Sequence, residues 1–328
     1  MNQVEQTKCC YKFAPIKELV ILANVLGISK DELLSLAANA SQSYHVREEQ
    51  KEGGGTRTIV NARPLLKRIQ RSIKTSFLDH VIYPRYLMGG IKDEIYPRDY
   101  KRNAELHSKA VILIREDILN YFPSITVRHI FSIWREFFRF APAVAECLTK
   151  LTTRNGELPQ GASTSNHLSN IIFWKCEPEL YADFTGQGLR YSRIIDDVIV
   201  SSPKRRLDSR ELATIVAKIY AMFGRNGFKP KRVKHGVESQ AGRITVNKVI
   251  ANRRASLSRE KQSAIRAVVK RCEATPLNQH NTHAYRKLFL SAVGSVGTLK
   301  RFHRLDAERL LQRLHAVRPQ KVGGTILA

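Results

Sequence analysis

The sequence predicts an α+β fold in which a small antiparallel sheet is backed by helices. Two β-branched runs of strand length, at 109–118 and 190–202, are separated by segments with helical periodicity. A pair of aspartates interrupts the second run, which therefore predicts a hairpin. Hydrophobic residues make up 43% of the 328 residues. That content suffices for one or two cored domains and rules out a disordered basic chain.

The first part of the chain predicts two short helices, a strand and a basic helix. The helices occupy 15–40, where Ser29 is the expected N-cap of the second helix and Glu32 completes a capping box. Three glycines and a β-branched segment at 51–60 predict a turn followed by a short strand. Residues 64–82 open on a proline and have helical spacing, which predicts a helix.

The central part of the chain predicts strands that alternate with helices. Asp117 ends the first strand, and a proline turn then leads into a helix that begins near Val127. Residues 158–180 predict a glycine-containing turn followed by one helix. The hairpin places Asp196 and Asp197 at its tip. This order of elements predicts a sheet covered by helices.

Positive charge dominates the chain and is concentrated late. The 55 Lys and Arg residues outnumber the 29 Asp and Glu residues, for a formal net charge of +26, and 203–271 holds 19 basic residues against four acidic ones. Residues 285–317 predict helices with basic outer faces, separated by Gly294 and Gly297. Such an excess indicates a polyanionic partner, with nucleic acid favoured over the alternative of an anionic membrane surface.

The sequence also predicts a soluble protein of a reducing compartment. The N-terminal segment lacks the apolar core of a secretory signal, and no apolar run reaches the roughly 18 to 20 residues that span a bilayer. The five cysteines are odd in number and form no Cys-x-x-Cys pair, so we expect neither a structural disulfide nor a zinc site.

Three carboxylates at strand ends are the candidate chemical groups. If the two strand ends converge, Asp117 and Asp196 face the same side of the sheet and bind two Mg²⁺ ions about 3.5 to 4 Å apart, with Mn²⁺ as an alternative ion. Asp197 points the other way in a strict alternation, which predicts a secondary role. The alternative is that Asp196 and Asp197 form a turn and need no metal, because adjacent aspartates are good turn formers.

Several segments match the motifs of one enzyme family in order. They are GGGTRTI with LLKRIQRSI at 53–73, NAELH at 103–107, DILNYFPSI at 117–125, LPQGASTS at 158–165 and YSRIIDD at 191–197. The order and spacing of these segments resemble those of the reverse transcriptases, and within them the bacterial retron type, over nearly the whole chain.

The resemblance implies a right-hand polymerase fold. A helical N-terminal extension would occupy 1–50, the fingers and palm 51–250, and a basic helical thumb 251–328. The implied reaction is RNA-directed DNA synthesis by two-metal nucleotidyl transfer from dNTPs, on a cognate structured non-coding RNA. The implied setting is bacterial anti-phage defence in the cytoplasm, with the RNA template, the DNA product and an effector or toxin protein as partners and no membrane.

The resemblance also assigns roles to single residues. Asp117, Asp196 and Asp197 would be the catalytic, metal-binding residues. Phe122 matches the steric gate that selects deoxynucleotides, although a core aromatic is the alternative. Lys234 matches a candidate proton donor to pyrophosphate, with a simple phosphate contact as its alternative.

Further residues would bind the nucleotide and the nucleic acid. Gln160 and Gly161 match a turn that packs on the incoming nucleotide and the template, and Arg57 matches a cation of the fingers that holds the triphosphate. Late basic residues would contact phosphates without reading base sequence. They are Arg253, Arg254, Lys300 and Arg301.

Departures from the family pattern keep two alternatives open. Ile194 stands where the family has tyrosine, Ile195 where a small residue is usual, Ser163 where proline is found, and ITV at 244–246 where retron enzymes have Val-Thr-Gly. One alternative is a defence-associated reverse transcriptase outside the true retrons, with unconventional templating or priming. The other is a catalytically silent RNA-binding scaffold with the same fold.

Overall fold

The computed structural model describes residues 7–50 and 56–319, without the side chain of Arg57. The described chain divides into two compact units. The first unit comprises 1–99 and 111–237, and the second comprises 100–110 and 238–328, within the described residues. The mixed helix and sheet composition predicted from the sequence is confirmed.

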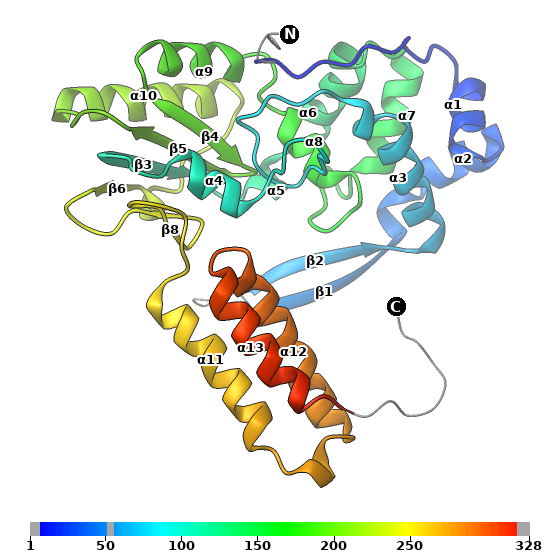
Figure 1. Ribbon diagram of the computed structural model, residues 1–328. Helices are drawn as coiled ribbons and strands as arrows, with labels where there is room; N and C mark the ends of the chain where they lie inside the picture. The colour runs from blue at the N-terminus through cyan, green and yellow to red at the C-terminus, as the bar shows by residue number, and fades with distance from the viewer. Residues whose placement is uncertain (1–6, 51–55, 320–328) are drawn as a thin grey trace. The chain divides into compact units, whose positions relative to one another are not determined.

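The first unit contains a four-stranded sheet, a two-stranded ribbon and the helices around them (Figure 1). Its strands are β1 (Tyr44–Gln50), β2 (Thr56–Ala62), β3 (Ile112–Asp117), β4 (Arg190–Ile194), β5 (Asp197–Ser202) and β6 (Gly236–Ser239). Its α-helices are α1 (Leu19–Leu26), α2 (Lys30–Ala38), α3 (Pro64–Ser76), α5 (Tyr121–Ser124), α6 (Val127–Ser132), α7 (Pro142–Thr152), α8 (Ser165–Ile171), α9 (Glu177–Gly186) and α10 (Ser209–Arg225). Its short helical turns are η1 (Ala40–Gln42), η2 (Leu78–His80), η3 (Ile133–Phe137, a π-helix) and η4 (Arg232–Lys234).

The sheet has the strand order β4-β5-β3-β6, and β5 pairs antiparallel with both β4 and β3. Helices α9 and α10 cover one face of this sheet (Figure 1). Strands β3 and β5 are buried on both faces, which explains their uninterrupted runs of β-branched residues. The predicted hairpin is confirmed.

The second unit is built around a three-helix bundle. Its elements are α4 (Tyr100–Leu106), β7 (Thr245–Val246), β8 (Val249–Ile250), α11 (Arg259–Ala274), η5 (Leu277–Gln279), α12 (His283–Lys300) and α13 (Arg304–Ala316). Buried apolar residues on α11, α12 and α13 form a hydrophobic core separate from the larger core of the first unit. The bundle therefore buries an apolar face of each helix and leaves the basic residues outside.

Local signals in the sequence predicted several boundaries correctly. Ser29 caps α2, and its Oγ accepts the backbone N–H of Glu32 at 3.2 Å while the Glu32 carboxylate accepts the Ser29 backbone N–H at 3.0 Å. Helix α6 begins at Val127 as predicted. These contacts lie within four residues of each other, so the sequence alone specifies them.

Two predicted helices are wrong. The single helix expected within 158–180 is two helices, α8 and α9, because Pro178 stands in the first turn of α9 and begins a new helix. The helices expected on either side of Gly294 and Gly297 are one helix, α12. Both glycines lie on its exposed surface, and packing of the opposite face holds the helix through them.

Strand β1 was missed by the sequence analysis. Five of its seven residues are exposed, so no alternation of apolar and polar residues marks it. The glycine turn predicted at 51–55 lies outside the described residues, whereas the strand predicted after it is β2. The expected boundaries near 50 and 250 do not coincide with those of the two units. The assignment of fingers, palm and thumb stays a prediction.

Candidate active site

The strands bring the three aspartates to one end of the sheet. Asp117, the last residue of β3, is directly opposite Asp197, the first residue of β5. Directly opposed residues on antiparallel strands project from the same face, so Asp117 and Asp197 share a face. Asp196 lies in the two-residue turn between β4 and β5, and its carbonyl accepts the backbone N–H of Ile118 at 3.2 Å. The three residues therefore converge.

The predicted orientation of Asp197 is wrong. Strict alternation was expected to turn its side chain away from Asp117, but alternation holds only within a strand, and Asp196 belongs to the turn rather than to β5. The opposite face of β3 is identified by Glu116, whose buried carboxylate accepts the Tyr220 hydroxyl of α10 at 2.9 Å and lies 2.5 Å from Nδ1 of His235. Asp117 and Asp197 thus point away from the helix that covers the sheet.

A lysine from η4, the helical turn before β6, contacts Asp117. The ammonium of Lys234 donates a hydrogen bond to Oδ2 of Asp117, and the Lys231 backbone N–H donates to the Asp117 carbonyl at 2.7 Å. The Lys234 side chain is 51% exposed, whereas that of Asp117 is 4% exposed. Burial disfavours the charged ammonium, but the hydrogen bond from Lys234 and the three carboxylate charges together raise the pKa of Lys234.

The carboxylates repel one another. Burial and then the charge of Asp117 raise the pKa of Asp196. Burial and then the charge of Asp196 raise the pKa of Asp197 to about 7. Both shifts arise because negative charges gather where little water can solvate them. Such a site favours a proton or a cation.

The donor set fits a hard divalent cation. Among the described residues, no group of three or more His, Cys, Asp or Glu side chains is arranged to enclose a metal ion. Mg²⁺ does not require such a cage, because one or two carboxylates commonly hold it together with water and substrate phosphates. The ammonium of Lys234 shows that a cation is already stabilised beside Asp117. Asp117 and Asp196, with Asp197 beside them, are the residues that would hold the ion.

These pKa shifts predict that Mg²⁺ stabilises the protein in a pH-dependent manner. Because the pKa of Asp197 is raised to about 7, its contribution to stability is complete below about pH 4 and is lost as the pH rises through 7. Without Mg²⁺, thermal unfolding should therefore shift to lower temperature between pH 5 and pH 7.5 as this group ionises. Added Mg²⁺ should raise the midpoint more at pH 7.5 than at pH 5, because it binds the ionised carboxylates.

Thermal denaturation with and without Mg²⁺ at both pH values checks this expectation. Asp183→Asn is the matched control, because Asp183 is an exposed carboxylate that pairs with Lys218 at 2.7 Å on the other side of the sheet. The control should keep the wild-type response, and Asp197→Asn should weaken it. An equal Mg²⁺ shift at the two pH values in the wild type would contradict the electrostatic account.

The predicted nucleotide-binding turn packs on the β1–β2 ribbon. The backbone N–H of Val60 donates to the Gln160 carbonyl at 3.2 Å. Gly161 has a φ of +110°, and a Cβ at this position would lie 3.0 Å from the Val60 carbonyl oxygen. Only glycine combines this φ with so close an approach. Arg57 lies on β2, but its side chain is outside the described residues.

Phe122 is the predicted steric gate, and it lies in α5, five residues after Asp117. Its ring is partly buried and packs against the core, with its centroid 6.0 Å from that of Tyr121. Tyr121 is buried, and its hydroxyl donates to the Ser169 carbonyl at 2.7 Å. Tyr121 therefore holds α5 in place and leaves the adjacent ring partly exposed.

The four predicted phosphate-binding residues all lie in the second unit. Arg253 and Arg254 are exposed after β8, and Lys300 and Arg301 are exposed at the end of α12. The guanidinium of Arg301 lies over the ring of Tyr100, 4.8 Å from its centroid, so this side chain has a packing contact as well.

Sequence analysis missed the residues that surround the hairpin. Arg193 is fully buried and pairs with Glu177, and Gly89 and Gly90 contact the turn from another side. Two signals were available. An arginine within a run that is predicted to be a core strand requires a buried partner, and a Gly-Gly pair is typical of close backbone approach.

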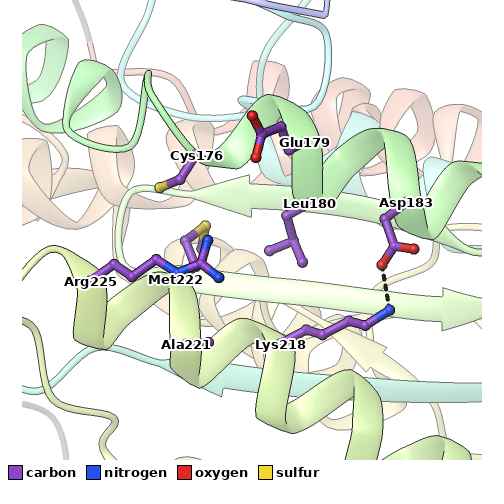
Figure 2. A pocket seen from close by; sticks show the side chains of 8 residues that line it. All are labelled: Cys176, Glu179, Leu180, Asp183, Lys218, Ala221, Met222 and Arg225. Carbon is purple, nitrogen blue, oxygen red and sulfur yellow. Dashed lines mark hydrogen bonds and ion pairs between the residues drawn. The ribbon is translucent and has the colours of Figure 1, made fainter.

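A cavity of about 190 Å³ lies between α9 and α10, away from the aspartates (Figure 2). None of the predicted site residues lines it. Figure 2 shows the ion pair of Asp183 and Lys218 at one end and Cys176 and Arg225 toward the other. The candidate chemistry is therefore at the strand ends.

Comparison with known proteins finds several reverse transcriptases of similar sequence. The retron Se72 reverse transcriptase of Salmonella heidelberg is 29% identical over 310 residues, which cover 93% of this chain and 80% of that protein. The chain is homologous to the retron reverse transcriptases. The retron Ec48 enzyme of Escherichia coli is 26% identical over 93% of the chain and 77% of that protein. The retron Ec86 enzyme of Escherichia coli is 26% identical over 76% of each.

Other comparisons are more distant. No protein-family model matches the chain. Apo telomerase of Candida tropicalis, truncated from its C-terminal domain, is 12% identical with a TM-score of 0.42, over 69% of this chain and 59% of that chain. Telomerase of Candida albicans with a telomeric RNA fragment is 9% identical with a TM-score of 0.44, over 84% and 63%. Within the described residues, no helix combines the length and apolarity required to traverse a bilayer.

Proposed function

We propose that this protein is a reverse transcriptase that copies a cognate structured non-coding RNA into DNA. Homology to retron enzymes over 93% of the chain supports this reaction class. The observation that carries the proposal is the register that sets Asp117 opposite Asp197, with Asp196 in the adjoining turn. A site with these carboxylates meets the requirements of nucleotidyl transfer.

The residues of the site have different roles in the proposed reaction. Asp117 and Asp196, assisted by Asp197, would hold Mg²⁺, which would supply electrostatic stabilisation to the attacking hydroxyl and the leaving pyrophosphate. Lys234 would give a proton to the leaving pyrophosphate, and the support for this role is that its ammonium is half exposed and charged beside Asp117. In-line transfer of the nucleotidyl group needs little else but positioning of the reactants.

The turn at Gln160 and Gly161 and the β1–β2 ribbon would contact the incoming nucleotide and template. Their support is the Val60 hydrogen bond that joins the two segments and the close packing of the Gly161 backbone on Val60. We assign the fingers and palm to 51–250 and the thumb to 251–328. The exposed cations of the second unit would bind the RNA–DNA backbone, with a steep dependence on salt.

We place the reaction in a retron of the bacterial cytoplasm, with a role in defence and an effector or toxin protein as a further partner. The homologues and the five cysteines, which are all free thiols, support this setting. The alternative of a defence enzyme outside the true retrons is favoured by Ile194, Ile195 and the 244–246 segment. Sequencing nucleic acid bound to the protein from its native operon separates them. A branched RNA–DNA hybrid supports a retron, and a repetitive or protein-primed product supports the alternative.

A catalytically silent scaffold is the candidate from another class. It is motivated by Ile194 and Ile195, which replace residues that flank the primer end in the family. Such a protein would bind the same RNA but would not extend a primer. Primer extension with Mg²⁺ and dNTPs therefore decides between the scaffold and the enzyme.

Replacing Phe122 with valine should relax selection against ribonucleotides. A smaller side chain leaves room for the 2′-hydroxyl, so we expect the ratio of kcat/KM for rNTP over dNTP to rise by about 10- to 100-fold, the range for pocket discrimination by one small group. Single-nucleotide incorporation with matched dNTP and rNTP measures this ratio. Phe131→Val, a change at a surface aromatic of α6, is the control and should leave the ratio unchanged. An unchanged ratio for Phe122→Val would assign this ring to packing alone.

A further inference from the structure

The turn that carries Asp196 holds an unfavourable backbone conformation. Ile195 has a φ of +57°, in the left-handed region that L-residues rarely adopt and β-branched residues disfavour most. Asp196 and Asp197 follow directly, so the conformation of Ile195 determines where their carboxylates lie. Something in the surrounding structure must hold this residue in place.

Arg193 contacts the turn from inside the protein. Its side chain is 0% exposed, and its Nη1 donates to the Ile195 carbonyl at 2.8 Å. The same guanidinium donates through Nε and Nη2 to the two carboxylate oxygens of Glu177, at 2.7 and 2.8 Å. Nη2 also donates to the Asn170 carbonyl at 2.9 Å. A planar group with a fixed fork of donors thus connects the turn to two other segments.

Glu177 fixes the guanidinium in turn. Glu177 is the first residue of α9 and is 2% exposed, and its Oε1 also accepts the Tyr191 hydroxyl at 2.7 Å. Arg193 and Tyr191 both belong to β4, so two side chains of this strand converge on one buried carboxylate. The turn is therefore tied to the helix behind the sheet.

A glycine pair confines the turn from another side. Met88, the residue before this pair, lies beside β4, and its backbone N–H donates to the Arg193 carbonyl at 2.8 Å. A Cβ on Gly89 would lie 2.7 Å from Cγ2 of Ile194, and a Cβ on Gly90 would lie 2.9 Å from Cδ1 of Ile195. The side chains of Ile194 and Ile195 therefore cannot move toward the glycine pair. Of the conformations that are left to the turn, the Arg193 hydrogen bond selects the one observed.

We propose that Arg193 is a positioning residue that places Asp196 and Asp197 for metal binding by holding the Ile195 carbonyl. The proposal rests on the proposed function, because the position of the turn matters only if Asp196 and Asp197 bind a metal ion. A purely structural ion pair would stabilise the fold without affecting the affinity for metal. The two roles therefore differ in a measurement that does not depend on DNA synthesis.

Binding of Mn²⁺ to the full-length protein, followed by the loss of the free-ion signal in electron paramagnetic resonance, provides that measurement. The variant is Arg193→Met combined with Glu177→Gln, which removes both buried charges and keeps an acceptor for Tyr191. Loss of outer partners of metal ligands typically weakens metal binding by about 10- to 100-fold, and we expect a loss of this size in a variant that still unfolds cooperatively. Wild-type Mn²⁺ affinity in the folded double variant would overturn the proposal.

Ile195→Gly tests whether Arg193 acts through the turn. Glycine adopts the left-handed conformation without strain, so adding Ile195→Gly to the double variant should restore most of the lost Mn²⁺ affinity. If the Mn²⁺ affinity is equally low with and without Ile195→Gly, Arg193 does not act through the turn. That result would contradict the proposal.

If the double variant does not fold, Arg193→Lys takes its place in the Mn²⁺-binding measurement. Lysine keeps a cation beside Glu177 but lacks the fork that reaches Ile195 and Asn170 together, so Mn²⁺ affinity should still fall. Unchanged affinity in this folded variant would overturn the proposal. Failure of the proposed function has a different result: the wild-type protein would bind Mn²⁺ but would extend no primer.

Discussion

Replacing Asp196 and Asp197 together with alanine is expected to abolish primer extension while RNA binding persists. The three carboxylates converge where β3 meets β5, and burial, followed by repulsion from the neighbouring aspartates, raises the pKa values of Asp196 and Asp197. Removing the ligands of a catalytic metal forfeits several kcal/mol of transition-state stabilisation, which corresponds to about 10³-fold or more in kcat. Extension of an annealed primer with Mg²⁺ and dNTPs measures the loss.

The control for this experiment is Asp183→Ala, which removes an exposed carboxylate from α9 and should leave the rate unchanged. RNA affinity should be unchanged in both variants, because the cations proposed to bind the backbone lie in the second unit. Equal extension by the wild type and the Asp196, Asp197 variant would eliminate the metal site. No extension by either protein, with RNA binding intact, would support the silent scaffold.

Removing the ammonium of Lys234 should have the second largest effect. Lys234 is the cation bonded to Asp117, and its raised pKa keeps it protonated at neutral pH. A positioned proton donor contributes about 10²- to 10⁴-fold to a rate, so Lys234→Ala should lower kcat by an amount in this range. Steady-state kinetics of single-nucleotide incorporation, with kcat and KM for the dNTP determined separately, measures the change.

Lys234→Arg distinguishes proton donation from a phosphate contact. Arginine keeps the positive charge but cannot release a proton near neutral pH, so we expect KM close to that of the wild type and a low kcat. A wild-type kcat for Lys234→Arg would assign Lys234 to phosphate binding only. Lys218→Ala is the matched control, because Lys218 also pairs with a carboxylate, Asp183, but lies between α9 and α10.

The sequence predicted best what depends on near neighbours. The capping box of Ser29 and Glu32 and the existence of the hairpin need only residues that are close in the chain, although the tip was predicted at Asp196 and Asp197 and the turn is Ile195 and Asp196. The convergence of Asp117 with the hairpin was a condition of the predicted metal site, and the order of the motifs supported it. The register itself, which places Asp197 on the face of Asp117, required the structure because Asp196 belongs to the turn.

The sequence signals that a buried arginine needs a partner and that a Gly-Gly pair allows close approach, but it does not specify which residues meet around the turn. Glu177 becomes the partner of Arg193 only because α9 packs behind β4 and excludes water from both side chains. Pairing over 16 residues leaves no periodic signal. Likewise, Gly89 and Gly90 owe their importance to the isoleucines that the fold brings against them, a contact that no local pattern specifies.

The central claim is that Asp117 and Asp196 hold the divalent ion that serves nucleotidyl transfer to a primer. Anomalous diffraction from crystals of the protein with primed RNA, an incoming dNTP and Mn²⁺ tests it most directly. The account predicts Mn²⁺ peaks between the carboxylates of Asp117 and Asp196 and the triphosphate, with Lys234 displaced from Asp117 toward the phosphates. A bound dNTP with no Mn²⁺ peak at these carboxylates, and Lys234 still bonded to Asp117, would contradict it.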